Sequence, residues 1–176
     1  MKNRLIDWYD LNKKSMPWRK NKDPYRVWVS EVMLQQTQVS TVIPYYNKWL
    51  KKFPSIKSIS LSKIDDILKL WEGLGYYRRA HNIKKSCDII MENFDGLIPD
   101  NEKFKDLPGV GDYIYSAVMS IAFDKPFPVI DGNVKRVCSR LWETNFLDTK
   151  SIRILKSKLL NNISKEVNYH LIPLND

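Results

Sequence analysis

The chain has 176 residues, and its 29 lysine and arginine residues against 20 aspartate and glutamate residues give it a formal net charge of +9. This length allows one ordinary core, in one domain or two small lobes, and the charge favours a polyanionic partner. No apolar run is long enough to cross a membrane and no signal peptide is recognisable, so we expect a cytoplasmic protein.

The cysteines and the spacing of apolar residues indicate the kind of protein and its fold class. Cys87 and Cys138 lie far apart, which gives neither a disulfide framework nor a zinc site, and we expect both thiols on apolar helix faces. Aromatic residues interleaved with cations suit stacking on nucleic-acid bases. Apolar residues recur at helical spacing and no segment reads as a convincing strand, so we predict an all-α fold.

Two helices are predicted on either side of a loop at residues 15–23. Asp23 beside Pro24 places a capping residue before proline at the first helical position, which predicts a second helix from Tyr25 to about Gln38. The apolar residues of the opening helix are Leu5, Trp8, Tyr9 and Leu11.

The second helix carries a carboxylate with apolar neighbours. Val27, Trp28 and Leu34 lie about one turn from Glu31. Such surroundings disfavour the ionised form and predict a raised pKa, as a general acid near neutral pH requires. A surface glutamate beside a few apolar residues would give the same pattern.

Three helices are predicted between residues 41 and 94. The first begins near Thr41 with Pro44 in its first turn. The second covers Lys63 to Trp71 after a capping box of Ser62 and Asp65, and a glycine pair ends it. The third begins near Tyr76, with inward positions Tyr77, Ala80, Cys87, Ile90, Met91 and Phe94.

The segment Tyr76-Tyr77-Arg78-Arg79 puts aromatic and cationic side chains at a junction between a loop and a helix. This arrangement suits a wedge between bases with phosphate contacts. A capped turn without ligand explains it equally well.

The sequence from Leu107 to Gly111 reads LPGVG and predicts a hairpin between two helices. Gly109 and Gly111 leave the right-handed region without penalty, and the N–H groups that open the following helix form a site for an anion. Apolar residues at helical spacing follow the hairpin.

Asp131-Gly132-Asn133 opens another predicted helix, with an apolar face of Val134, Val137, Cys138 and Leu141. A carboxylate at a helix N-terminus is held ionised by the dipole and free N–H groups. A plain N-cap is the alternative. A fixed anion among Lys135 and Arg136 suits stabilisation of a positive reaction centre. A last helix is predicted from Ile152, Leu155, Leu159 and Ile163, before a tail at residues 168–176 without periodicity.

Together these motifs resemble the helix-hairpin-helix DNA glycosylase superfamily, and within it the MutY-type adenine DNA glycosylases. The resemblance runs from Trp8 to about Trp142. Its most specific pieces are MPWR at 16–19, WVSEVMLQQTQ at 28–38, WEGLGYY at 71–77, LPGVG at 107–111 and DGNVKR at 131–136.

The resemblance implies an all-α fold with two helical lobes and a DNA-binding cleft between them: a barrel lobe at 20–131, and an incomplete lobe at 1–19 plus 132–176. Adenine opposite 8-oxoguanine or guanine would be flipped out of the duplex and hydrolysed from its sugar. Glu31 would protonate the base, Asp131 would stabilise or trap the sugar cation, and Tyr113 and Asn133 would assist.

The resemblance also assigns binding residues. The substrate-binding positions are Trp18, Arg19, Leu34, Gln36 and Tyr76, with Gln36 and Tyr76 forming the wedge beside the lesion. The phosphate-binding positions are Gly109, Val110, Gly111, Lys135 and Arg136. The expected partner is double-stranded DNA with A·8-oxoguanine or A·G mispairs, bound by a monomer associated with the nucleoid.

The chain departs from this family in two ways. Tyr113 occupies the position where endonuclease III-type enzymes carry a Schiff-base lysine, so strong β-lyase activity is not expected. The cysteines that bind a 4Fe–4S cluster in the intact family, and its separate domain that reads 8-oxoguanine, are missing. We therefore expect a C-terminally truncated member without a metal or cofactor, either a fragment of a longer product or a shortened form.

Two other functions stay open at this point. A related enzyme that removes thymine from T·G mismatches has a similar pocket, although Glu31 and the DGNVKR motif favour adenine. A helix-hairpin-helix fragment that binds DNA without catalysis is the second alternative, and retention of both Glu31 and Asp131 argues against it.

Overall fold

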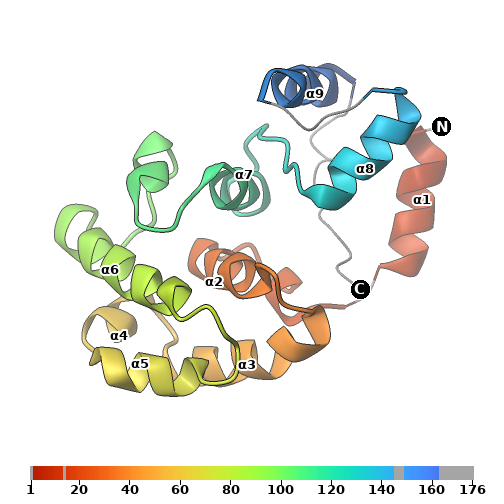
Figure 1. The fold of residues 1–176 in the computed structure, drawn as a ribbon. Coiled ribbons are helices and arrows are strands. Elements are labelled where there is room, and N and C mark those ends of the chain that lie inside the picture. Colours follow the sequence, from red (N-terminus) through yellow and green to blue (C-terminus); the bar gives the residue numbers. More distant parts are fainter. Residues whose placement is uncertain (1, 14, 145–148, 163–176) are drawn as a thin grey trace.

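The computed structural model describes residues 2–13, 15–144 and 149–162, and these ranges contain helices and no strand. This confirms the all-α prediction. Among the described helices, none is long and apolar enough to span a membrane. The elements shown in Figure 1 are α1 (Lys2–Asn12), η1 (Pro17–Arg19), α2 (Pro24–Leu34), α3 (Val39–Lys52), α4 (Ile56–Ser60), α5 (Ile64–Trp71), α6 (Arg78–Asn93), η2 (Glu102–Asp106), α7 (Asp112–Ile121), α8 (Gly132–Leu141) and α9 (Thr149–Asn162).

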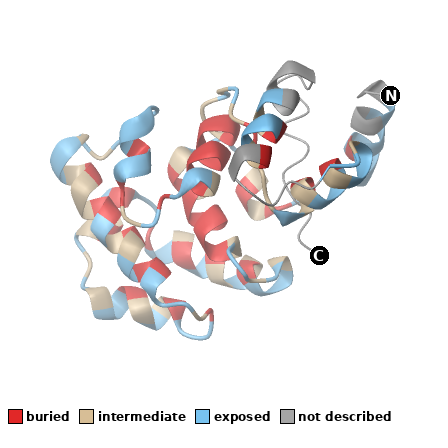
Figure 2. Ribbon diagram, turned by 45° about the horizontal axis from the view of Figure 1, so that its top comes forward, coloured by how far each residue is buried: buried red, intermediate tan, exposed pale blue. Residues whose placement is uncertain are grey.

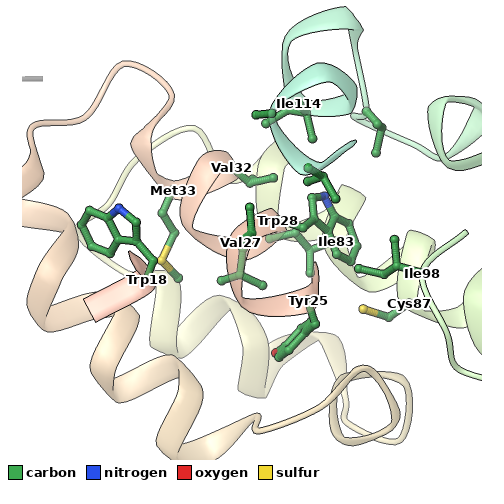
Figure 3. Packing of buried hydrophobic residues seen from close by; sticks show 14 of the residues in the cluster. Trp18, Tyr25, Val27, Trp28, Val32, Met33, Ile83, Cys87, Ile98 and Ile114 are labelled. Atoms are coloured by element: carbon green, nitrogen blue, oxygen red, sulfur yellow. The ribbon is translucent and has the colours of Figure 1, made fainter. Parts of the chain in front are cut away.

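Helix α2 lies at the centre of the molecule, with α3 packed on one side and α7 on another (Figure 1). Asp23 caps it by accepting a hydrogen bond from the Arg26 N–H at 2.9 Å, as the sequence predicts. Its side chains are buried on nearly every face, which is the pattern of a helix inside a core rather than on a surface (Figure 2). In Figure 3, Trp28 and Ile83 lie to one side of α2 and Trp18 to the other.

In the part of the chain that the structure describes, most buried apolar residues belong to two clusters of very different size. The large cluster joins η1 and α2 to α7, and it includes Trp28, Trp49 and Trp71. The small cluster consists of Val134, Cys138 and Leu155, between α8 and α9. Met16 and Trp18 pack in the large cluster. The division into lobes at 20–131 and at 1–19 plus 132–176 stays a proposal, and the separate small cluster supports it.

Several predicted boundaries were wrong. Helix α2 ends at Leu34 because Gln36 adopts a left-handed backbone with φ 56°. Helix α3 therefore begins at Val39, which places Pro44 inside the helix rather than in its first turn. Lys63 precedes α5 without a side-chain cap, and the capping box is formed instead by Ser55 and Ser58 at the start of α4, a helix that the sequence did not reveal.

Some predicted inward positions are exposed. Tyr77 precedes α6 and is exposed, and so are Val137 and Leu141 on α8 and Trp8 and Leu11 on α1. Cys87 and Cys138 are both buried, as predicted. The side chains of Leu5 and Leu159, together with Ile163 and the tail, lie outside the described residues.

The hairpin before α7 uses its two glycines differently. Gly109 has φ +81°, and a Cβ there would lie 2.8 Å from the Asn82 side-chain nitrogen. Gly111 is the N-cap of α7 with φ −84°, and a Cβ there would meet nothing within 4 Å. The expectation that both glycines need unusual freedom was therefore right only for Gly109.

Gly109→Ala should lower the free energy of unfolding by at least about 1 kcal/mol, because alanine is strained in the left-handed region and its Cβ would press on Asn82. In Gly111→Ala, the loss of a favourable cap and the lower entropy of the unfolded chain offset each other, so the net change should be small. Urea unfolding of the two variants measures this difference. Equal destabilisation would contradict the assignment.

Candidate active site

Glu31 lies on α2 with only 2% of its surface exposed. Burial raises the pKa of its carboxyl to about 7, against the lowering effects of a hydrogen bond from Tyr113 and of the charge on Arg19. The negative charge of Asp131 also raises this pKa. The raised pKa predicted from the apolar neighbours is confirmed, and the carboxyl can exchange a proton near neutral pH.

Tyr113 reaches Glu31 from the first turn of α7. Its hydroxyl donates a hydrogen bond to Glu31 Oε2 at 2.9 Å, across the contact between α2 and α7. Burial and the neighbouring Glu31 raise the pKa of Tyr113 far above its ordinary value, so this hydroxyl keeps its proton. A permanent donor beside Glu31 stabilises the carboxylate form after a proton has left it.

Asp131 is the N-cap of α8, as the sequence predicts. Its Oδ1 accepts a hydrogen bond from the Val134 N–H at 2.7 Å, and the side chain is partly buried. Its charge acts on both Glu31 and Tyr113. Two carboxyl groups from different helices are therefore close enough for their charges to interact, one buried in α2 with a pKa near 7 and the other at the N-terminus of α8.

A cavity of about 30 Å³ adjoins Glu31. It has room for about one water molecule. Trp18 and Arg19 from η1 line it, and their contact with a base stays a prediction. Residues that the sequence analysis did not select complete the lining: Tyr9, Val27, Ser30 and Ile121.

Tyr9 is a residue of the site that the sequence did not predict. Arg19 Nη1 donates to the Tyr9 hydroxyl at 3.4 Å, which ties α1 to η1 at the cavity. Ser30 lies beside Glu31, and its hydroxyl donates to the Val27 carbonyl at 2.7 Å. These pairings depend on where the helices pack, and no local sequence motif predicts them.

The remaining predicted substrate positions do not line this cavity. Leu34 is partly buried against the large cluster. Gln36 and Tyr76 are exposed on two loops, each with a left-handed backbone. The prediction that the segment Tyr76–Arg79 makes phosphate contacts is wrong for Arg79. Its side chain is buried, and its guanidinium donates hydrogen bonds to backbone carbonyls.

The predicted phosphate positions differ in what they can offer. The Val110 N–H already donates to the Leu107 carbonyl at 3.0 Å, and the Val110 side chain is buried, so Gly109 and Gly111 are the better candidates. Arg136 is exposed and donates to Asn133 Oδ1 at 3.1 Å, while Lys135 is partly buried. Asn133 therefore orients a cation at the start of α8.

The cysteines do not fit an iron–sulfur cluster. A 4Fe–4S cluster is held by four thiolates, and the chain has two cysteines, buried in different helices. Among the described residues, no group of three or more His, Cys, Asp or Glu side chains could hold a metal ion.

Comparisons with known proteins agree with this geometry. The family described as "HhH-GPD superfamily base excision DNA repair protein" matches residues 29–162. The adenine DNA glycosylase of Buchnera aphidicola subsp. Baizongia pistaciae is 43% identical over 91% of this chain and 46% of its own length. That of Rattus norvegicus is 42% identical over 78% of this chain and 28% of its own length. The chain thus spans less than half the length of these relatives.

The solved structure of a thermostable thymine-DNA glycosylase superposes with a TM-score of 0.82 at 26% identity, covering 96% of this chain and 80% of that one. The helical architecture, the hairpin before α7 and the family match lead to the same result. The chain belongs to the HhH-GPD superfamily of base excision DNA repair proteins.

Proposed function

We propose that this chain carries the catalytic residues of a DNA glycosylase that hydrolyses the N-glycosidic bond of adenine mispaired with 8-oxoguanine or guanine. The observation that carries the proposal is the buried carboxyl of Glu31, with a pKa of about 7 and a hydrogen bond from Tyr113, close enough to Asp131 for their charges to interact. The curated relatives named adenine DNA glycosylase support the choice of base.

In the first step, protonated Glu31 donates its proton to the purine, and the bond between the base and the sugar breaks with its electrons leaving on the base. The Tyr113 hydroxyl, 2.9 Å from Oε2, stabilises the carboxylate that this transfer creates. Leaving a charged carboxylate in a buried, apolar site would otherwise be costly, and this hydrogen bond lowers that cost.

Asp131 acts on the sugar. Loss of the base leaves a positively charged, oxocarbenium-like sugar, and the anion at the N-terminus of α8 stabilises it or bonds to it covalently. Glu31, now ionised, takes a proton from the water that completes hydrolysis. The cavity beside Glu31, of about 30 Å³, matches a water molecule, so a flipped purine enters only when lining side chains such as Trp18 and Arg19 move.

The duplex partner is supported by charge and by the hairpin. A net charge of +9 favours a polyanion, and the N-terminus of α7 at Gly111 points N–H groups outward toward an anion. Lys135 and Arg136 at the start of α8 add cations near Asp131. Binding to duplex DNA should weaken steeply with salt because phosphates carry most of it.

A second candidate, removal of thymine from T·G mismatches, is favoured by one observation, the superposition on the thymine-DNA glycosylase at a TM-score of 0.82. That structure is 26% identical, whereas the adenine-specific relatives are 42–43% identical. We therefore prefer adenine over thymine as the base that is removed.

An abasic-site assay under single-turnover conditions separates the candidates. Duplexes with A·8-oxoguanine, A·G, T·G or A·T should be cleaved after alkali only at adenine in the first two. Glu31→Gln should slow excision by at least about 100-fold while binding stays nearly unchanged, because glutamine keeps the shape and cannot donate the proton. Excision of thymine supports the second candidate, and binding without any excision would reduce the chain to a DNA-binding fragment.

The same substitution should alter stability in a manner that depends on pH. The pKa of Glu31 rises from 4.5 in the unfolded chain to about 7 in the folded protein. The neutral carboxyl therefore makes its full contribution to stability below pH 4.5, and this contribution is lost as the pH rises to about 7. Glu31→Gln should therefore raise the free energy of unfolding by about 3 kcal/mol at pH 8 and change it little at pH 4.5.

Urea unfolding at the two pH values measures this effect. Glu92, exposed on α6, provides the control, and Glu92→Gln should behave like the parent at both. A loss of stability in Glu31→Gln at pH 8 would contradict the assigned burial of the charge.

The rate of excision should fall as the pH rises above about 7, because the acid must be protonated to act. Tyr113→Phe removes the hydrogen bond that lowers the pKa of Glu31, so this fall should move to higher pH in the variant. Single-turnover rates between pH 5.5 and 9 test it. Tyr45→Phe, which removes a hydroxyl bonded to the Glu72 carbonyl between α3 and the end of α5, should leave the profile in place.

A further inference from the structure

Arg79 lies in the first turn of α6 and is 9% exposed. Its Nη1 donates to three carbonyls at the end of α2, those of Val32 at 2.9 Å, Met33 at 3.0 Å and Gln35 at 2.6 Å. The last carbonyls of a helix have no partner inside it, so these bonds complete the C-terminus of the helix that carries Glu31.

The other arm of the same guanidinium holds a second loop. Nη2 donates to the carbonyls of Leu74 at 3.1 Å and Gly75 at 3.2 Å, beyond the end of α5. It also lies 3.4 Å from the Thr37 hydroxyl oxygen, which accepts a hydrogen bond from it. The loops at residues 35–37 and 73–76 are therefore joined through one planar, two-armed group, which lysine cannot replace.

The residue after each held carbonyl is strained and exposed. Gln36 follows Gln35 with φ 56°, and Tyr76 follows Gly75 with φ 49°. A residue with a side chain costs about 1–2 kcal/mol in this region and keeps it only when its surroundings impose it. The Arg79 guanidinium also lies 5.4 Å from the centre of the Tyr76 ring, within reach of a cation–π contact.

The Arg79 side chain and the first of these loops lie beside the hairpin before α7. A small cavity of about 20 Å³ is lined by Gln35 and Arg79 together with Pro108 and Gly109 of the hairpin. Gln36 follows Gln35 directly, and the Tyr76 ring lies 5.4 Å from the Arg79 guanidinium, so both exposed residues neighbour groups that line this cavity.

We propose that Arg79 is a positioning residue that fixes Gln36 and Tyr76 as a pair, so that they can enter a duplex beside the flipped nucleotide. The inference rests on the proposed function for the nature of the ligand. It assigns Arg79 no contact with DNA, because its guanidinium is turned inward onto carbonyls. Its role is to make two loops, far apart in the sequence, act as one rigid element.

The test compares two affinities for each variant, so that it needs no catalysis. One ligand is a duplex with a stable abasic-site analogue opposite 8-oxoguanine, and the other is an undamaged duplex of the same sequence. Arg79→Lys keeps the charge and removes the fork. The ratio of the affinity for the abasic-site duplex to the affinity for the undamaged duplex should fall by about tenfold. Binding to the undamaged duplex and its salt dependence should stay at the parental values.

A double-variant cycle distinguishes positioning from general support of the fold. In the Gln36→Ala/Tyr76→Ala background, Arg79→Lys should lower the ratio no further, because the pair that it positions is gone. The same tenfold loss in that background would overturn the proposal. Arg153→Lys, the same exchange at an exposed site on α9, is the matched control and should leave both affinities unchanged.

Local order gives a second measurement. The Thr37 N–H bonds to the Leu34 carbonyl and the Leu74 N–H bonds to the Trp71 carbonyl, so exchange of both amides should be faster in Arg79→Lys, with no change at Tyr115 in α7. If Arg79→Lys does not fold, Thr37→Val removes one of the arginine's partners and should lower the affinity ratio less, in the same direction. A parental ratio in Arg79→Lys, or in Thr37→Val where Arg79→Lys does not fold, would overturn the proposal. Absence of base excision in the parent chain would instead refute the proposed function alone.

Discussion

The structure depends on one costly feature, a carboxyl group buried at the centre of a helix that is itself buried on nearly every side. Desolvation raises the pKa of Glu31 to about 7, and a hydrogen bond from Tyr113 and the charge on Arg19 limit that rise. An apolar residue at this position would stabilise the core. A destabilising buried acid of this kind is typical of a functional site, and the proposed function uses its proton.

The elements around α2 supply what this acid needs. Helix α7 brings the Tyr113 hydroxyl, η1 brings Arg19, and the N-terminus of α8 brings Asp131. The two carboxyl groups have different surroundings, because Glu31 is buried among apolar side chains, which raises its pKa, and Asp131 caps a helix. One fold thereby brings a buried carboxyl and a capping carboxyl to the same region.

The end of α2 links this chemistry to the surface. Arg79 bonds to carbonyls that follow α2 and α5, so a single side chain ends the helix of Glu31 and shapes the loops of Gln36 and Tyr76. The guanidinium bonds to carbonyls of both loops, and the proposed role of Arg79 rests on these bonds. Between α8 and α9, the buried cluster among the described residues consists of Val134, Cys138 and Leu155.

Local chemistry was sufficient to predict the helical class, the caps at Asp23 and Asp131, the hairpin at Leu107–Gly111 and the raised pKa of Glu31, since each depends on residues within a turn or two. The partners of Glu31 were expected only through the resemblance to a family. Only the tertiary structure decided that Tyr113 donates to Glu31 Oε2, that Tyr9 completes the cavity, and that Arg79 turns inward instead of toward a phosphate. The contact of Tyr113 with Glu31 joins residues 82 positions apart, and Arg79 reaches a carbonyl 47 positions away. No local pattern determines which distant carbonyl or carboxyl a side chain will meet once the helices have packed.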